Sequence, residues 1–362
     1  MEMQKLKKGD KVAIVSLSSG ILGEPFIKHE LDLGIKRLEE LGLVPVFMDN
    51  TLKGLDYIRD NPKSRAEDLK KAFYDNEIKA IITAIGGNDS FKILPYLFDD
   101  EEFILAVKNN PKIFTGYSDT TTTHLALNKL GLNTFYGPAF ITDFAEFENN
   151  MLPYTKNSLM YLFNAPNNYE IKPSDVWYKE RTDFSPASVG TLREKFSETN
   201  GYEVLQGTGT ATGKLIGGCL ELFSMLSGYN TNGEDELQAE RNKIMAKYPI
   251  IPTKEELSGK ILFLETSDGK PTPENYRNMI KHLKSIGLFD NISGLLIGKP
   301  MDEAYYSEYK EILISELNEF NLPILFNLNF GHSFPRMTLP YGAVAEINAD
   351  KKTLTLKSST LK

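Results

Sequence analysis

Nucleophilic catalysis is the chemistry that the polar residues of this chain could best support, and it begins with Ser118. A serine hydroxyl attacks a carbonyl near neutral pH only when a base accepts its proton, and histidine is the usual base. Ser118 follows an apolar run, residues 112–116, and precedes Asp119 and four threonines that begin an amphipathic segment. This order predicts a tight strand-to-helix turn that lifts the hydroxyl out of a sheet. A serine and an aspartate that only cap a helix would give the same pattern.

His332 is the predicted general base among the four histidines. It lies in a loop after the apolar run 324–328, and the preceding Gly331 allows close backbone approach. The other histidines are expected at the surface, at its boundary or in packing, and they are His29, His282 and His124.

Glu265 is the predicted partner of this histidine, because a catalytic imidazole needs a carboxylate to fix its tautomer and stabilise its cation. It ends the predicted strand 260–264 and precedes a Thr-Ser-Asp-Gly loop. A strand-end glutamate that faces solvent would fit the sequence equally well. Together, Ser118, Glu265 and His332 would form a triad in the chain order Ser-Glu-His.

Two glycine turns are predicted to approach a ligand with their backbone. Gly86 and Gly87 follow the predicted strand 80–85, and the amides of Gly87 and Asp119 could form an oxyanion hole. The spacing does not match that of phosphate-binding loops. Gly218 belongs to a similar turn and is expected to line the same cleft.

The elements that must position these residues alternate between strands and helices in the first half of the chain. This alternation predicts a parallel sheet with helices on both faces and a ligand site at the carboxyl ends of its strands. One helix is expected to begin at Ser64, with Glu67 completing a capping box. The second half predicts mixed α/β structure with a final hairpin that turns at residues 349–351.

A chain of 362 residues suggests two domains. We predict an N-terminal α/β domain over residues 1–164 that carries the serine, and a mixed α/β domain over residues 207–362 that carries the glutamate and histidine. Residues 165–206 are rich in Pro, Ser and Asn and are predicted to be an interdomain loop. The only tryptophan, Trp177, lies in this loop and has either a functional role or an anchoring role.

Composition excludes several classes of function. The chain has 41 basic and 49 acidic residues, a net charge of −8, and no long run of either sign, which argues against nucleic acid as a partner. No segment approaches transmembrane length, so no membrane contact is expected. The single cysteine, Cys219, precludes an intrachain disulfide and favours a reducing cytoplasm, and it is expected to be buried filler. No histidine spacing suggests a metal site, and no cofactor is expected.

Seven motifs occur in order over residues 10–347: GGNDS, GYSDTT, FYGPA, GKLIGGCLE, ILFLE, GLLIG and FGHS. In these motifs the chain resembles the serine LD-carboxypeptidases, a family that includes muramoyltetrapeptide carboxypeptidases and microcin C self-immunity proteins. The resemblance implies a cytoplasmic, metal-independent homodimeric peptidase with a Rossmann-like N-terminal domain and a site between its domains. By residue, it implies the triad Ser118, Glu265 and His332 and the oxyanion donors Gly87 and Asp119.

Two branches of this family differ in substrate. Murein enzymes release a terminal D-alanine from a tetrapeptide, whereas immunity proteins cleave an amide between an aminoacyl group and a nucleotide-like group. Trp177 in an interdomain loop resembles the immunity branch, where it could stack on a purine. We therefore expect an immunity-type carboxypeptidase acting on an aminoacyl-nucleotide or a related small peptide through an acyl-enzyme. A murein LD-carboxypeptidase and a non-catalytic peptide or nucleotide binding module are the alternatives.

Overall fold

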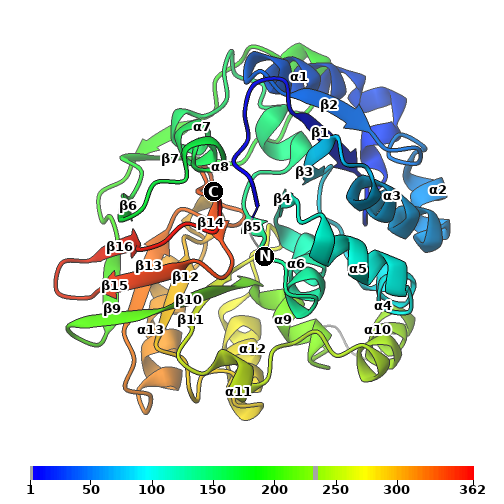
Figure 1. Cartoon of the computed structure of the whole chain (residues 1–362). Helices are drawn as coiled ribbons and strands as arrows, with labels where there is room; N and C mark the ends of the chain where they lie inside the picture. Colours follow the sequence, from blue (N-terminus) through cyan, green and yellow to red (C-terminus); the bar gives the residue numbers. More distant parts are fainter. Residues whose placement is uncertain (1–2, 231–234) are drawn as a thin grey trace.

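The computed structural model describes residues 3–230 and 235–362, which form two large β-sheets flanked by helices and one small two-stranded sheet (Figure 1). The first sheet has the order β14-β5-β4-β3-β1-β2, and its first five strands in chain order are all parallel. Its strands are β1 (Lys11–Val15), β2 (Val44–Phe47), β3 (Ile78–Thr83), β4 (Ile113–Gly116), β5 (Phe135–Tyr136) and β14 (Leu339–Pro340). The strand β14 pairs antiparallel with β5, so the C-terminal part of the chain completes the N-terminal sheet.

The second sheet is mixed and has the order β6-β16-β15-β10-β11-β12-β13-β9. The four strands from β10 to β13 are parallel, and antiparallel strands extend both edges. The strands are β6 (Tyr169–Ile171), β9 (Glu203–Gln206), β10 (Thr210–Cys219), β11 (Ile261–Glu265), β12 (Gly294–Gly298), β13 (Ile324–Leu328), β15 (Val344–Asn348) and β16 (Thr353–Leu356). The predicted α/β fold class and the final hairpin are therefore confirmed.

Helices cover both sheets. Those of the first half are α1 (Lys28–Glu40), α2 (Leu55–Asp60), α3 (Pro62–Tyr74), α4 (Leu94–Phe98), α5 (Glu101–Asn109), α6 (Thr121–Lys129), α7 (Pro153–Leu159) and α8 (Tyr161–Asn164). Those of the second half are α9 (Leu220–Leu226), α10 (Glu236–Lys247), α11 (Lys254–Leu257), α12 (Pro273–Ser285) and α13 (Tyr306–Leu317). Over the described ranges, none of these helices has the length and apolar character needed to cross a membrane.

The predicted capping box of the third helix is wrong. Helix α3 begins at Pro62, two residues before Ser64. Proline suits the first helical position because it lacks the N–H that would have no partner there. The Ser64 hydroxyl instead lies 3.2 Å from the Tyr57 hydroxyl, and the Glu67 carboxylate accepts a hydrogen bond from Lys70.

The segment 165–206 contains more regular structure than a loop. Its ends form β6 and β9 of the second sheet, and its middle forms a separate two-stranded sheet from β7 (Val176–Tyr178) and β8 (Lys195–Ser197). The Tyr178 N–H also donates to the Phe334 carbonyl, which ties β7 to the loop after β13. The domain limits at residues 164 and 206 stay a prediction.

One apolar core runs through both sheets and fixes their relative position. The strands β11 and β12 are buried along their whole length, as expected for parallel strands covered on both faces. At the junction the ring of Phe263 in β11 lies 5.5 Å from that of Tyr136 in β5. The carboxyl end of β11 is thereby held close to the first sheet.

Candidate active site

Ser118 occupies the strand-to-helix turn that the sequence predicts. It follows β4 in a short 3-10 turn, Ser118–Thr120, which leads into α6. Its φ of +64° lies in the left-handed region, which costs energy for a residue with a side chain. Strained turns of this kind present the nucleophile in α/β hydrolases. A Cβ atom at Gly86 would lie 2.9 Å from the Ser118 Oγ, so this close approach requires glycine.

A hydrogen-bonded chain links the three residues of the predicted triad. The His332 Nε2 lies 3.0 Å from the Ser118 Oγ, and the His332 Nδ1 lies 2.8 Å from the Glu265 Oε2. The same carboxylate oxygen accepts the backbone N–H of His332 at 3.1 Å. Glu265 is 2% exposed, so the alternative of a solvent-facing glutamate is wrong. This pairing favours the tautomer with the proton on Nδ1, which leaves Nε2 able to accept the serine proton.

The charge of Glu265 controls the basicity of His332. Burial lowers the pKa of His332, but the attraction and hydrogen bond of Glu265 outweigh burial, so the pKa is raised from its ordinary value. Asp268 contributes in the same direction from the cavity side, with its Oδ1 3.9 Å from the His332 Nε2. The imidazolium formed by proton transfer from a serine would therefore be stabilised here.

Tyr136 forms hydrogen bonds to the two terminal residues of the triad, Ser118 and Glu265. The sequence analysis assigned it no role. Its hydroxyl donates to the Glu265 Oε1 at 2.6 Å and accepts the backbone N–H of Ser118 at 3.1 Å. Burial raises the pKa of Tyr136 well above its ordinary value, so the phenol stays protonated and remains a donor. The sequence feature that could have indicated a role for Tyr136 is the FYGPA motif that contains it.

We expect Tyr136→Phe to lower kcat/KM by about 10- to 100-fold, because a hydrogen bond to a charged group contributes about 1.5–3 kcal/mol. Without the phenol, the charge of Glu265 is less compensated and stabilises the His332 cation more. The acid limb of the pH–kcat/KM profile should therefore move to higher pH, which a merely structural role would not cause. Steady-state kinetics across pH measures both effects, and the exposed Tyr96→Phe is the matched control. An unchanged profile would exclude this positioning role.

The glycine turn after β3 faces the serine. Gly86 and Gly87 line the same cavity as Ser118, and a Cβ atom at Gly86 would lie 3.3 Å from the Asp119 amide nitrogen. The Asp119 carboxylate accepts the backbone N–H of Ser90 at 2.9 Å, which fixes the turn from inside the protein. Gly87 thus lines the cavity beside Ser118, and Asp119 follows the serine directly in the chain; their role as oxyanion donors stays a prediction.

The cavity has a volume of about 530 Å³, and Ser118 and His332 form part of its wall. Gly218 does not line it, so that expectation is wrong: a Cβ atom there would meet the Thr121 side chain, which shows that Gly218 packs against α6. Trp177 also lies outside the lining and stacks on Phe196 with ring centroids 4.3 Å apart, which supports an anchoring role.

Phe184 is the aromatic residue of the 165–206 segment that does line the cavity. It is 52% exposed, and its ring lies 6.3 Å from that of Phe147. The sequence analysis selected Trp177 because it is the only tryptophan, and it gave Phe184 no role. Which of the two rings reaches the cavity depends on how the segment 165–206 packs against the rest of the protein.

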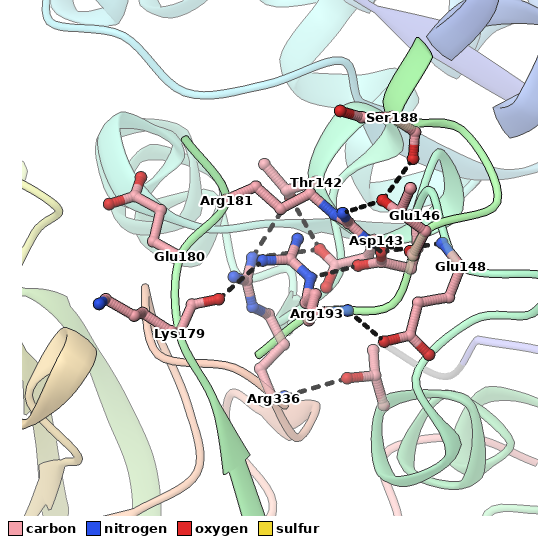
Figure 2. A network of polar contacts seen from close by, with 12 residues as sticks. Thr142, Asp143, Glu146, Glu148, Lys179, Glu180, Arg181, Ser188, Arg193 and Arg336 are labelled. Carbon is pink, nitrogen blue, oxygen red and sulfur yellow. Dashed lines mark hydrogen bonds and ion pairs between the residues drawn. The ribbon is translucent and has the colours of Figure 1, made fainter. Parts of the chain in front are cut away.

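A buried ion-pair network holds this wall in place. Figure 2 shows the side chains of Arg181 and Arg193 converging on Glu146 from the 165–206 segment, at 3.2 Å and 2.6 Å. The Glu148 carboxylate accepts the backbone N–H of Arg193 at 2.9 Å. Arg336 forms a neighbouring pair with Asp143 at 3.2 Å. These contacts fix the segment that carries Phe184. No local sequence pattern predicts them.

Two further residues considered in the sequence analysis, His124 and Cys219, are buried in the protein interior. His124 is fully buried between Thr134 and the Gly116 carbonyl, and burial lowers its pKa to about 3, so the predicted packing role is confirmed. Cys219 is fully buried, as predicted. Within the described ranges, no group of three or more His, Cys, Asp and Glu side chains has the geometry of a metal site.

The fold and this geometry define an α/β enzyme of the serine peptidase class. Two family models match the chain: the LD-carboxypeptidase N-terminal domain over residues 12–137 and the LD-carboxypeptidase C-terminal domain over residues 212–347. The chain therefore belongs to the LD-carboxypeptidase family.

Several relatives are similar along almost their whole length. A solved MccF-like protein from Streptococcus pneumoniae in complex with AMP is 45% identical, with 96% of this chain and 99% of that chain covered and a TM-score of 0.90. The Microcin C7 self-immunity protein MccF of Escherichia coli is 28% identical over 92% of this chain and 90% of its own length. One solved structure of MccF holds aspartyl sulfamoyl adenosine, at 25% identity, full coverage of both chains and a TM-score of 0.82. The "Probable murein peptide carboxypeptidase" of Bacillus subtilis is 28% identical over 98% of this chain and 93% of its own length.

Proposed function

We propose that this protein hydrolyses an amide bond with Ser118 as nucleophile, His332 as general base and Glu265 as the partner of the histidine. The observation that carries the proposal is the hydrogen-bonded chain from the Ser118 Oγ through His332 to Glu265, at 3.0 Å and 2.8 Å, in the wall of one cavity. A serine beside a histidine whose other nitrogen meets a carboxylate is the recurring arrangement of acyl-transfer enzymes.

The steps follow from these positions. The Ser118 Oγ bonds to the substrate carbonyl carbon while its proton passes to the His332 Nε2, and the amides of Gly87 and Asp119 stabilise the oxyanion. The tetrahedral intermediate collapses, the C–N bond breaks, and the imidazolium returns the proton to the leaving nitrogen. Water then attacks the acyl-enzyme with His332 again as base, which releases the acid and regenerates the serine.

We infer that the substrate is an aminoacyl-nucleotide or a close analogue. The support is the likeness to proteins whose solved structures hold AMP and aspartyl sulfamoyl adenosine, together with the aromatic wall formed by Phe184 and Phe147. Phe184 replaces Trp177 in our proposal as the residue that stacks on the base, because it lines the cavity. A cytoplasmic homodimer is part of the same proposal.

We expect Phe184→Ala to raise KM for an aminoacyl sulfamoyl adenosine by about 5- to 100-fold, because stacking on a base contributes about 1–3 kcal/mol. Trp177→Ala should change KM less. The control is Leu192→Ala, a 75% exposed residue of the same segment that does not line the cavity. Steady-state kinetics with mass-spectrometric detection gives these values. A large effect of Trp177→Ala with none of Phe184→Ala would return the stacking role to the tryptophan.

The second candidate is a murein tetrapeptide carboxypeptidase that releases D-alanine. The observation in its favour is the end-to-end likeness to the Bacillus subtilis protein. The same catalytic residues would perform this reaction, so only substrate comparison separates the two. Turnover of neither substrate would favour a binding module.

A further inference from the structure

Glu30 is a buried carboxylate in the cavity wall without a hydrogen-bonded partner. It lies in the first turn of α1, lines the cavity, and has a side chain that is only 6% exposed. In the described parts of the chain, the nearest basic group is the His29 Nε2 at 3.9 Å. That nitrogen lies closer to the Phe184 carbonyl oxygen, at 3.0 Å, so its N–H is directed there.

The other acidic residues of the cavity differ from Glu30. Glu146 is paired with two arginines, Glu180 lies 3.6 Å from the Lys270 Nζ, and the Asp268 side chain is 67% exposed. Among the described lining residues, Glu30 is thus the one buried carboxylate that has no hydrogen bond and whose nearest basic group is a histidine at 3.9 Å.

The surroundings of Glu30 are apolar and aromatic. Phe26 and Ile27 precede it on the chain and line the cavity with it. The neighbouring His29 ring lies 5.4 Å from the ring of Phe147, which in turn contacts Phe184. Burial raises the pKa of Glu30 to about 7, which disfavours its ionised form relative to that of an exposed glutamate. A buried carboxylate without a hydrogen bond costs stability, and such groups concentrate at functional sites.

We propose that Glu30 is a specificity residue that accepts hydrogen bonds from the vicinal ribose hydroxyls of the nucleoside. A carboxylate offers two acceptor oxygens at a spacing that suits adjacent hydroxyl groups, and acidic residues bind ribose in this way in dinucleotide-binding folds. The nearby Phe147 and Phe184 would hold the base, which brings the sugar toward Glu30. The inference rests on the proposed nucleotide substrate and adds the group that is recognised.

The test compares three substrates: an aminoacyl sulfamoyl adenosine, its 2′,3′-dideoxy analogue, and an aminoacyl methyl sulfamate without a nucleoside. Wild type should prefer the ribose substrate to the dideoxy analogue at least about 10-fold in kcat/KM. Glu30→Ala should lose this preference, because its kcat/KM should fall more on the ribose substrate than on the dideoxy analogue or the methyl sulfamate. The exposed Glu39→Gln on the same helix is the matched control.

A second measurement separates a binding role from a structural one. Glu30→Gln removes the buried charge while it keeps the size of the side chain, so its melting temperature at pH 8 should exceed that of wild type although its ribose preference falls. The sign follows from the raised pKa: ionisation of Glu30 costs stability once the pH passes its unfolded value near 4.5, and the full cost applies above about pH 7. If Glu30→Gln melts below wild type at pH 8, its lower ribose preference reflects lost packing, and the binding role is contradicted.

Two results would overturn the inference: equal rates of wild type on the ribose and dideoxy substrates, or equal losses of Glu30→Ala on all three substrates. If no aminoacyl sulfamoyl adenosine is hydrolysed, the proposed function fails separately. In that case, calorimetry with AMP and 2′,3′-dideoxy-AMP still tests Glu30, since it needs no turnover.

Discussion

Ser118→Ala is expected to lower kcat on the substrate by at least about 10³-fold, because it removes the hydroxyl that we propose as the nucleophile. The fold and ligand affinity should persist, since the change removes one oxygen that bonds to His332 in the cavity wall. Single-turnover kinetics and calorimetry with AMP measure the two quantities.

Ser118→Gly is the matched control for backbone strain. Glycine adopts the observed φ of +64° freely, whereas alanine does not. The glycine variant should therefore be more stable than the alanine variant by about 1–2 kcal/mol and equally inactive. Retention of more than a few per cent of activity in either variant would remove Ser118 from the nucleophile role.

Glu265→Gln is the second change with a large expected effect, a loss of about 10²- to 10⁴-fold in kcat. The Glu265 Oε2 accepts both the Nδ1 proton and the backbone N–H of His332. An amide in this place can present its NH₂ group to Nδ1, which would shift the imidazole proton to Nε2 and prevent it from accepting the serine proton.

The pH profile of Glu265→Gln distinguishes this account from simple misfolding. In wild type the carboxylate raises the pKa of His332, so activity is lost as the pH falls through a value above the ordinary one. Without the carboxylate, the largest remaining influence on that pKa is burial, which lowers it, and the residual activity should extend to lower pH. An acid limb at the wild-type position would contradict the assigned role of Glu265.

The sequence allowed prediction of the parts of the site that depend on local pattern. Glu265 and His332 lie at the carboxyl ends of two parallel strands of the second sheet, so their approach could be expected. Ser118 follows a strand of the first sheet, and no sequence pattern predicts how the two sheets meet. Their assembly nevertheless needs Tyr136, whose two hydrogen bonds join residues 18 and 129 positions away. Contacts between residues so far apart in the sequence cannot be predicted from local patterns, and the only indication of a role for Tyr136 is its place in the FYGPA motif.

Other features depended on tertiary structure in the same way. The strand β14 completes the first sheet from the far end of the chain, and the segment 165–206 becomes ordered through pairing with distant strands. Within the segment, β7 pairs with β8, and this pairing places Trp177 against Phe196, whereas Phe184 lines the cavity. The predicted cap at Ser64 failed because the proline two residues earlier had already started the helix.

The most direct test of the central claim is a side-by-side hydrolysis assay on an aminoacyl sulfamoyl adenosine and on a murein tetrapeptide, with wild type and Ser118→Ala and detection by mass spectrometry. We predict that wild type cleaves the adenosine substrate with the higher kcat/KM and that Ser118→Ala cleaves neither. Faster release of D-alanine than of the nucleoside would contradict the substrate assignment, and cleavage by Ser118→Ala would contradict the mechanism.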